Sequence, residues 1–123
     1  IYMSYVLAEQ PVCVKGPLHR TRDFTYIDDV VEALCFGLKE EADGKIFNVC
    51  TGRELSVSEV LKTVFDSFDV TQEYPVEIHP RTPRDIDHSC GDYSLIQASL
   101  GWEPKVRFED GVQSMANWLR GIN

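Results

Sequence analysis

Arginines and aspartates in two segments of the sequence could bind an anion. The segment TRDFTYIDDVV carries Arg22, and the polar segment PRTPRDIDHSCGD carries Arg81 and Arg84. A guanidinium is always charged, and its planar fork of donors matches two oxygens of a phosphate group. The sequence therefore predicts an anion site around Arg22. The residue types leave a second interpretation open, in which Arg22 pairs with Asp23 or another carboxylate and the loop arginines are simply solvated.

The aspartates near Arg22 could suggest metal or acid–base chemistry, but structural roles are favoured. We expect Asp23 to accept hydrogen bonds from local backbone donors. Asp28 is a plausible N-cap of a following helix, because its carboxylate can accept from free N–H groups in the first turn. Asp29 stands at the same helix start, where negative charge is favourable.

The cysteines and tyrosines offer no second site by their spacing. The four cysteines contain no C-x-x-C pair, so we expect small buried side chains in a reducing compartment. No histidine stands at ligand spacing beside paired cysteines, and no metal site is predicted. No tyrosine is followed four positions later by a lysine, and there is no glycine-rich G-x-x-G-x-x-G turn. We therefore expect neither catalytic nor cofactor-binding residues in this chain.

Net charge and hydropathy exclude several classes of partner. The formal net charge of −8 repels nucleic acid and anionic lipid, whereas one small diphosphate needs only a few local donors. No run of ~18 apolar residues is present, so we expect no membrane span. The sequence contains no basic segment followed by an apolar stretch of the kind that forms a secretory signal, and a cytoplasmic location is expected.

Short strands alternate with helices along the chain. Periodic apolar residues and turn residues predict helices over residues 1–10, from Asp28 to before Asp43-Gly44, from the capping box of Ser56 and Glu59 onward, over 93–100, and around 112–121. Strands are predicted at 12–15, 46–50 and 76–79, and residues 80–92 as a loop. The predicted class is α/β, of an α+β-like kind with about four helices, in a single domain over residues 1–123.

Three segments resemble one enzyme family. The stretch PVCVKGPLHRTRDFTYIDDVV resembles the pattern P-L-x-V-y-G-d-G-x-q-x-R-D-F-v-y-V-d-D-v of the NAD-dependent epimerase/dehydratase family, the extended short-chain dehydrogenases that act on nucleotide-diphosphate sugars. The resemblance implies that Arg22 approaches the diphosphate. It also implies that the strand containing Val14 contacts the base through its backbone. Gly16-Pro17-Leu18 replaces the usual glycine-aspartate-glycine turn, and Lys15 replaces an aromatic residue.

The second segment, PRTPRDIDHSCGDYSLIQASLGW, resembles the family pattern R-P-G-D-v-x-x-s-x-a-D-x-s-k-A-x-x-x-L-G-W. Asp85 aligns with the aspartate that contacts the ribose. The position of the second phosphate-binding arginine falls on Thr82, so either Arg84, which is slightly favoured, or Arg81 would supply that charge. The third segment, LGWEPKVRFEDGVQSMANW, resembles the family ending, and its tryptophans, Trp102 and Trp118, are expected to be core or edge anchors.

The resemblance implies the C-terminal nucleotide-sugar-binding portion of an extended short-chain dehydrogenase without its Rossmann half. The motifs most resemble those of UDP-sugar 4-epimerases, and the same scaffold also serves dTDP-sugar dehydratases and UDP-glucuronate decarboxylases. The intact enzyme would bind NAD in the other half, and this chain by itself would be inactive. Its partner would be a UDP-sugar. The helix after Asp28 and the strand at 46–50 would lack their packing partner, which predicts a homo-oligomer or a domain swap. The alternative is a stand-alone nucleotide-binding or structural interaction module without catalysis.

Overall fold

The computed structural model describes residues 1–121, which form an α/β structure of five α-helices, one 3-10 helix and four short strands. The helices are α1 (Tyr2–Leu7), α2 (Ile27–Phe36), η1 (Glu40–Ala42), α3 (Val57–Ser67), α4 (Ser94–Leu100) and α5 (Phe108–Gly121). The strands are β1 (Val12–Lys15), β2 (Thr21–Asp23), β3 (Glu54–Ser56) and β4 (Val76–His79). The fold class predicted from the sequence is therefore confirmed.

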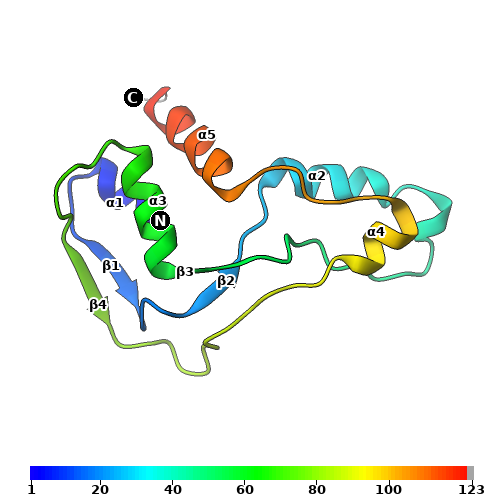
Figure 1. Ribbon diagram of the computed structural model, residues 1–123, viewed down its shortest axis with the longest axis horizontal. Helices are drawn as coiled ribbons and strands as arrows, with labels where there is room; N and C mark the ends of the chain where they lie inside the picture. Colours follow the sequence, from blue (N-terminus) through cyan, green and yellow to red (C-terminus); the bar gives the residue numbers. More distant parts are fainter. Residues whose placement is uncertain (122–123) are drawn as a thin grey trace.

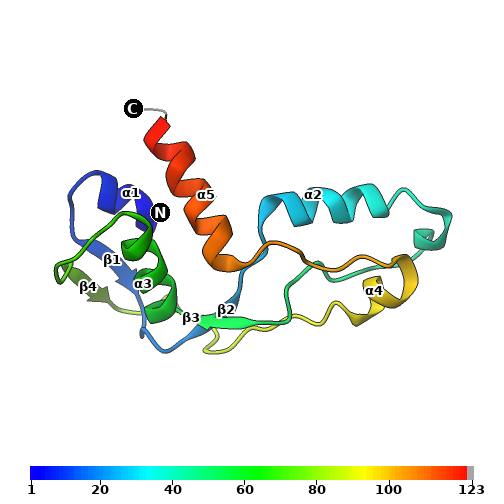
Figure 2. The same cartoon turned by 45° about the horizontal axis from the view of Figure 1, so that its top comes forward.

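The four strands form two separate two-stranded pairs, and the molecule has two lobes (Figure 1). β1 pairs with β4 in parallel, and β2 pairs with β3 in the antiparallel direction. One lobe holds α1, the β1–β4 pair, α3 and α5, and the other holds α2, η1 and α4 (Figures 1 and 2). The short β2–β3 pair lies where the two lobes join, and it positions the residues of the candidate site.

The first lobe is built around α3 and the inner face of β1. Ser56 accepts a hydrogen bond from the backbone N–H of Glu59 at 3.2 Å while the Glu59 carboxylate accepts from the Ser56 backbone at 2.7 Å, which confirms the predicted capping box. Steps of three and four along α3 bring its apolar residues to one face. That face packs with Val12 and Val14 of β1, both fully buried.

The second lobe has a smaller core around Trp102. Trp102 is 1% exposed and meets Tyr93 edge to face, with ring centroids 6.2 Å apart. Gly101 ends α4 in the left-handed conformation at φ 73°, as its position after an apolar helix predicts. Trp118 of α5 is 64% exposed, so the anchoring role expected of both tryptophans holds for Trp102 but not for Trp118.

Several local predictions were wrong. α2 has Tyr26 rather than Asp28 at its N-cap, with no side-chain capping bond, and it ends at Phe36 before the separate helix η1. Residues 46–50 run as irregular chain because no described segment pairs with them. Of the four cysteines only Cys50 is buried.

The chain passes between the lobes repeatedly. The first core draws on residues near both ends of the chain and on α3, whereas the second core draws on α2, α4 and the segments beside them. Neither lobe is thus a continuous stretch of sequence (Figure 1). Among residues 1–121, no helix combines the length and apolar character needed to cross a membrane.

Candidate functional site

β2 brings two arginines to one cavity. Arg22 lies opposite the buried Leu55 in the β2–β3 register, and Arg20 precedes it by two residues. Residues two apart on an extended chain point to the same side. Both guanidiniums line a cavity of about 320 Å³ whose wall is completed by Asp85 and by apolar and aromatic side chains, namely Tyr2, Phe24, Val57 and Val60. The cavity therefore combines positive charge with an apolar wall.

The carboxylate of Asp85 lies between the two arginines. One Nη of Arg20 and one Nη of Arg22 donate to its two oxygens, and Arg22 also donates to the carbonyl of Thr21 at 2.6 Å. The three side chains are 14–28% exposed. Burial raises the pKa of Asp85, but the charges and hydrogen bonds of Arg20 and Arg22 outweigh it and hold the pKa below its ordinary value. Asp85 is thus an ionised carboxylate that occupies both guanidiniums.

Arg81 holds the loop that carries Asp85. Its guanidinium donates to the carbonyl of Asp85 and pairs with the carboxylate of Asp87 at 3.2 Å. The carbonyl of Asp87 accepts from the Thr21 N–H at 2.7 Å, which ties the loop to β2. Gly16, at φ 89°, lies beneath Arg81, and a Cβ there would come within 3.1 Å of the Arg81 Cβ. The loop is therefore fixed against β2 by Arg81 rather than by Arg84.

The other residues expected at the site lie differently. Arg84 is exposed, has a left-handed backbone at φ 66°, and forms no hydrogen bond or ion pair with any residue in the described range 1–121. Val14 lies in the first core, outside the cavity, with its backbone paired to Ile78 of β4. The structure thus brings Arg22, Asp85 and Arg81 together and leaves Arg84 in solvent.

Arg20 is a site residue that the sequence did not single out. Its signal was the alternation R-T-R at residues 20–22, which places two guanidiniums on one side of an extended segment. No strand is predicted at residues 20–23 from the sequence, so the two side chains cannot be assigned to one side without the β2–β3 pairing. Two arginines therefore bind the carboxylate of Asp85, and a third, Arg81, binds its backbone carbonyl, in a chain whose net charge is −8.

The neighbouring aspartates have structural roles, but not the local ones expected. The Asp23 carboxylate accepts from the backbone N–H groups of Thr51 at 3.0 Å, Gly52 at 2.9 Å and Gly91 at 3.2 Å. Asp29 is 2% exposed and accepts from two distant N–H groups, those of Lys105 at 3.1 Å and Val106 at 3.0 Å. Each carboxylate fastens one end of the 21–31 segment to chain that lies far away in sequence.

The sequence is similar to those of enzymes named for nucleotide sugars. Residues 2–115 match the family model for GDP-mannose 4,6 dehydratase. The chain is 29% identical to the dTDP-D-glucose 4,6-dehydratase of Homo sapiens over 125 residues, covering 97% of this chain and 35% of that protein.

Solved structures of longer proteins share the fold of this chain. The crystal structure of UDP-glucose 4-epimerase from Thermotoga maritima with UDP-glucose is 30% identical, with a TM-score of 0.89, and covers 98% of this chain and 38% of that one. The UDP-glucuronic acid 4-epimerase of Bacillus cereus, in complex with UDP-glucuronic acid and NAD, is 20% identical with a TM-score of 0.90, covering 99% and 39% respectively, and supports the fold only. The chain thus spans about 35–39% of the length of these relatives.

Proposed function

Because the chain belongs to the NAD-dependent epimerase/dehydratase family and corresponds to the C-terminal part of its members, we propose that residues 1–123 form the nucleotide-sugar-binding portion of a UDP-sugar 4-epimerase. The observation that carries the proposal is the pair of guanidiniums, Arg20 and Arg22, facing one cavity with an apolar wall. A nucleotide diphosphate needs both features, because its phosphates require donors and its base and ribose require a surface to pack on.

In the proposed complex the diphosphate takes the place that the Asp85 carboxylate holds between the two guanidiniums. Arg22 and Arg20 then donate to phosphate oxygens, and Asp85, released from them, accepts from a ribose hydroxyl. Arg84 is the second-phosphate ligand of this proposal, because Arg81 is engaged in holding the loop while Arg84 is available in solvent. The backbone at Val14 borders the base. The acidic surface does not prevent this, because salt screens charges beyond about 8 Å.

Calorimetric titration of the 123-residue chain with UDP-glucose, UDP and uridine tests the proposal. UDP and UDP-glucose are expected to bind, and uridine at least about tenfold more weakly, because each charge-assisted phosphate contact contributes about 1.5–3 kcal/mol. Equal affinity for uridine and UDP would exclude a diphosphate site. Absence of all binding would favour the structural interaction module that the sequence left open.

NAD is the control ligand in the same titration. The proposal assigns NAD to the part of the enzyme beyond these residues, and the hydride transfer with it. We therefore expect no heat with NAD and no conversion of UDP-glucose by the 123 residues, because they contain neither a Y-x-x-x-K pair nor a glycine-rich phosphate turn. Turnover by the purified chain would contradict this assignment.

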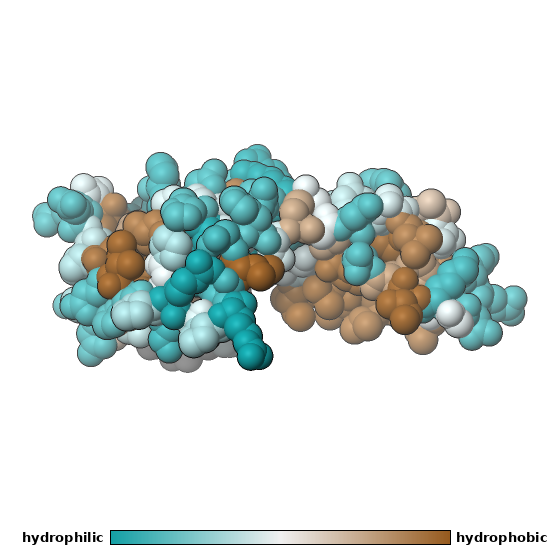
Figure 3. Space-filling view, turned by 90° about the horizontal axis from the view of Figure 1, so that it is seen from below, coloured by the Kyte–Doolittle hydropathy of each residue, from teal (hydrophilic) through white to brown (hydrophobic). Residues whose placement is uncertain are grey.

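The apolar outer face of α2 suggests how two copies of the chain associate. Val31 and Leu34 of α2, and Leu38 two residues beyond its end, recur at steps of three and four and are 50%, 68% and 88% exposed. Figure 3 shows hydrophobic side chains gathered on one face of the lobe that holds α2 and α4. The chain spans little more than a third of its relatives, so in a longer protein other residues would cover this face. For the 123 residues alone we propose that a second copy covers it.

Leu34→Glu is expected to shift the 123-residue chain from dimer to monomer. The substitution places a charge in the centre of the apolar face, and because Leu34 is 68% exposed the fold is retained. Light scattering over a range of concentrations measures the change. Leu95→Glu, which alters a leucine of α4 that is 54% exposed, is the matched control and leaves the dimer intact. A wild-type monomer at high concentration would contradict the assembly.

A further inference from the structure

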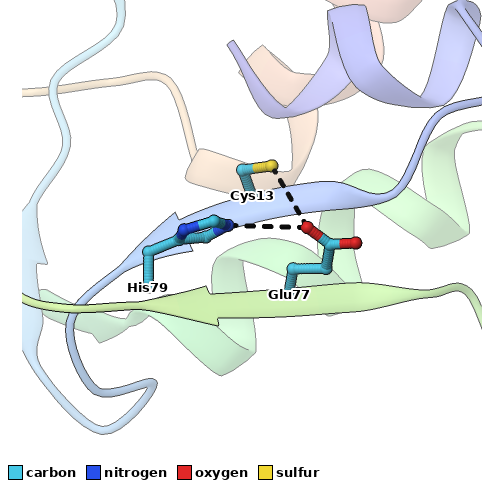
Figure 4. A group of neighbouring side chains, drawn as sticks. All are labelled: Cys13, Glu77 and His79. Atoms are coloured by element: carbon cyan, nitrogen blue, oxygen red, sulfur yellow. Dashed lines mark hydrogen bonds and ion pairs between the residues drawn. The ribbon is translucent and has the colours of Figure 1, made fainter.

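A cysteine, a glutamate and a histidine meet on the outer face of the β1–β4 pair. Cys13 lies opposite Glu77 in the parallel register, and His79 follows Glu77 by two residues on the same side of β4. The register thus gathers donors that are far apart in sequence. Figure 4 shows the Cys13 sulfur and the His79 ring both directed at one carboxylate oxygen of Glu77. The opposite side of β1 holds Val12 and Val14, so the core fixes the orientation of this face.

The spacing of the donor atoms approaches that of a tetrahedral zinc site. The Cys13 Sγ is 3.9 Å and the His79 Nε2 is 3.5 Å from the Glu77 Oε2, and the three donor atoms all lie within 4.8 Å of one another. Zinc bonds of about 2.3 Å to sulfur and about 2.0 Å to nitrogen and oxygen, at tetrahedral angles, place the sulfur and oxygen about 3.5 Å apart and the nitrogen and oxygen about 3.3 Å apart. Both distances from the Glu77 Oε2 are thus within a few tenths of an ångström of the tetrahedral values.

The chemistry of the three donors favours zinc over harder cations. Thiolate and imidazole suit zinc, whereas magnesium and calcium prefer oxygen ligands throughout. A thiolate and a carboxylate together carry about two negative charges, which a divalent cation neutralises. Glu77 and His79 have side chains 58% and 49% exposed, so a fourth position remains open to solvent.

Two neighbouring residues affect cation binding at this site in opposite directions: Tyr5 favours it and Lys15 opposes it. Tyr5 of α1 lines the same cavity as Cys13. A hydroxyl beside a metal-bound thiolate can donate to it and orient it. Lys15, opposite His79 in the register, is a cation on the same face, but its side chain is exposed and free to turn toward water.

We propose that Cys13, Glu77 and His79 bind a zinc ion on the outer face of the β1–β4 pair. The spacing of cysteines and histidines along the sequence predicted no metal site, because Cys13 and Glu77 are 64 residues apart and only the parallel register brings them together. The open fourth position makes this a site of the exchangeable kind, in contrast to closed structural zinc sites with four protein ligands. The proposal is independent of nucleotide binding.

Titration of the full chain with Cd²⁺, followed by the ultraviolet absorption of the thiolate–cadmium bond, tests the proposal, with competition by Zn²⁺ to confirm the natural cation. One saturable ion per chain is expected. Cys13→Ser is expected to remove the absorption band. Glu77→Gln and His79→Ala keep the band but weaken binding by at least about tenfold, since even changes outside the ligand set cost 10–100-fold in affinity.

A matched control comes from the chain itself. His88 and Cys90 are a second exposed histidine and cysteine two residues apart, and the paired variants His88→Ala and Cys90→Ser are expected to leave the band and the affinity unchanged. Circular dichroism confirms the fold of each variant, and Glu77 and His79 are exposed enough to be replaced without loss of the core. No band in the wild type, or a band that survives Cys13→Ser and is lost with Cys90→Ser, overturns the proposal.

Discussion

Arg22→Ala is expected to weaken the binding of UDP-glucose by about 10- to 100-fold, the largest effect on binding of any single substitution in the cavity. The loss corresponds to the roughly 1.5–3 kcal/mol that a hydrogen bond to a charged group contributes. Arg22 offers two donors at once, because its guanidinium donates to both the Asp85 carboxylate and the Thr21 carbonyl. Calorimetric titration of the variant measures the change.

Two further variants separate phosphate binding from general charge and from folding. Arg22→Lys keeps the positive charge but loses the planar fork, so only part of the affinity is expected to return. Arg107→Ala removes a guanidinium that is 71% exposed and pairs with Glu109 at 3.5 Å, and it is expected to leave UDP-glucose binding unchanged. If Arg22→Ala and Arg107→Ala have equal affinity, Arg22 is not a phosphate ligand.

Asp23→Ala is expected to lower the free energy of unfolding by about 2–4 kcal/mol, the largest stability effect among the charged residues of the 21–31 segment. The substitution leaves three backbone N–H groups, those of Thr51, Gly52 and Gly91, without the acceptor that they share. A buried donor without a partner costs about 1–3 kcal/mol, and solvent can reach some of these groups, which limits the sum. Urea denaturation followed by circular dichroism measures the change.

Asp28→Ala is the matched control for this experiment. Asp28 is exposed in the first turn of α2, and its removal costs only the interaction with the helix dipole, less than about 1 kcal/mol. Equal stability of the two variants would show that the bonds of Asp23 do not hold the 21–31 segment in place.

The sequence predicted the elements whose signals are local. The capping box of Ser56 and Glu59, the left-handed Gly101, and the strands of β1 and β4 depend on neighbouring residues and on apolar alternation. The resemblance also placed Arg22 and Asp85 on one site, and the structure brings them together. Their binding role remains a prediction.

The features that the sequence missed depend on contacts between distant segments. β2 and β3 are three residues each and exist only because residues 21–23 meet residues 54–56, so no pattern within either segment reveals them. The opposite error occurred at residues 46–50, where strand-forming side chains have no strand beside them and Ile46 is 90% exposed. A strand needs a neighbour to satisfy its backbone, and its residue types cannot supply one.

Because the chain passes repeatedly between the two lobes, a single proteolytic cleavage cannot separate them. Each core gathers segments from several parts of the sequence, so no single cut separates one lobe from the other with its core intact. A protease that cleaves the loop at 80–92 would leave two pieces that still pack together, through α3 against α5 and through the second core, which joins α2 with α4. The lobes are therefore not independent units that recombination could exchange. Unfolding of one core would also free the chain segments that connect to the other core.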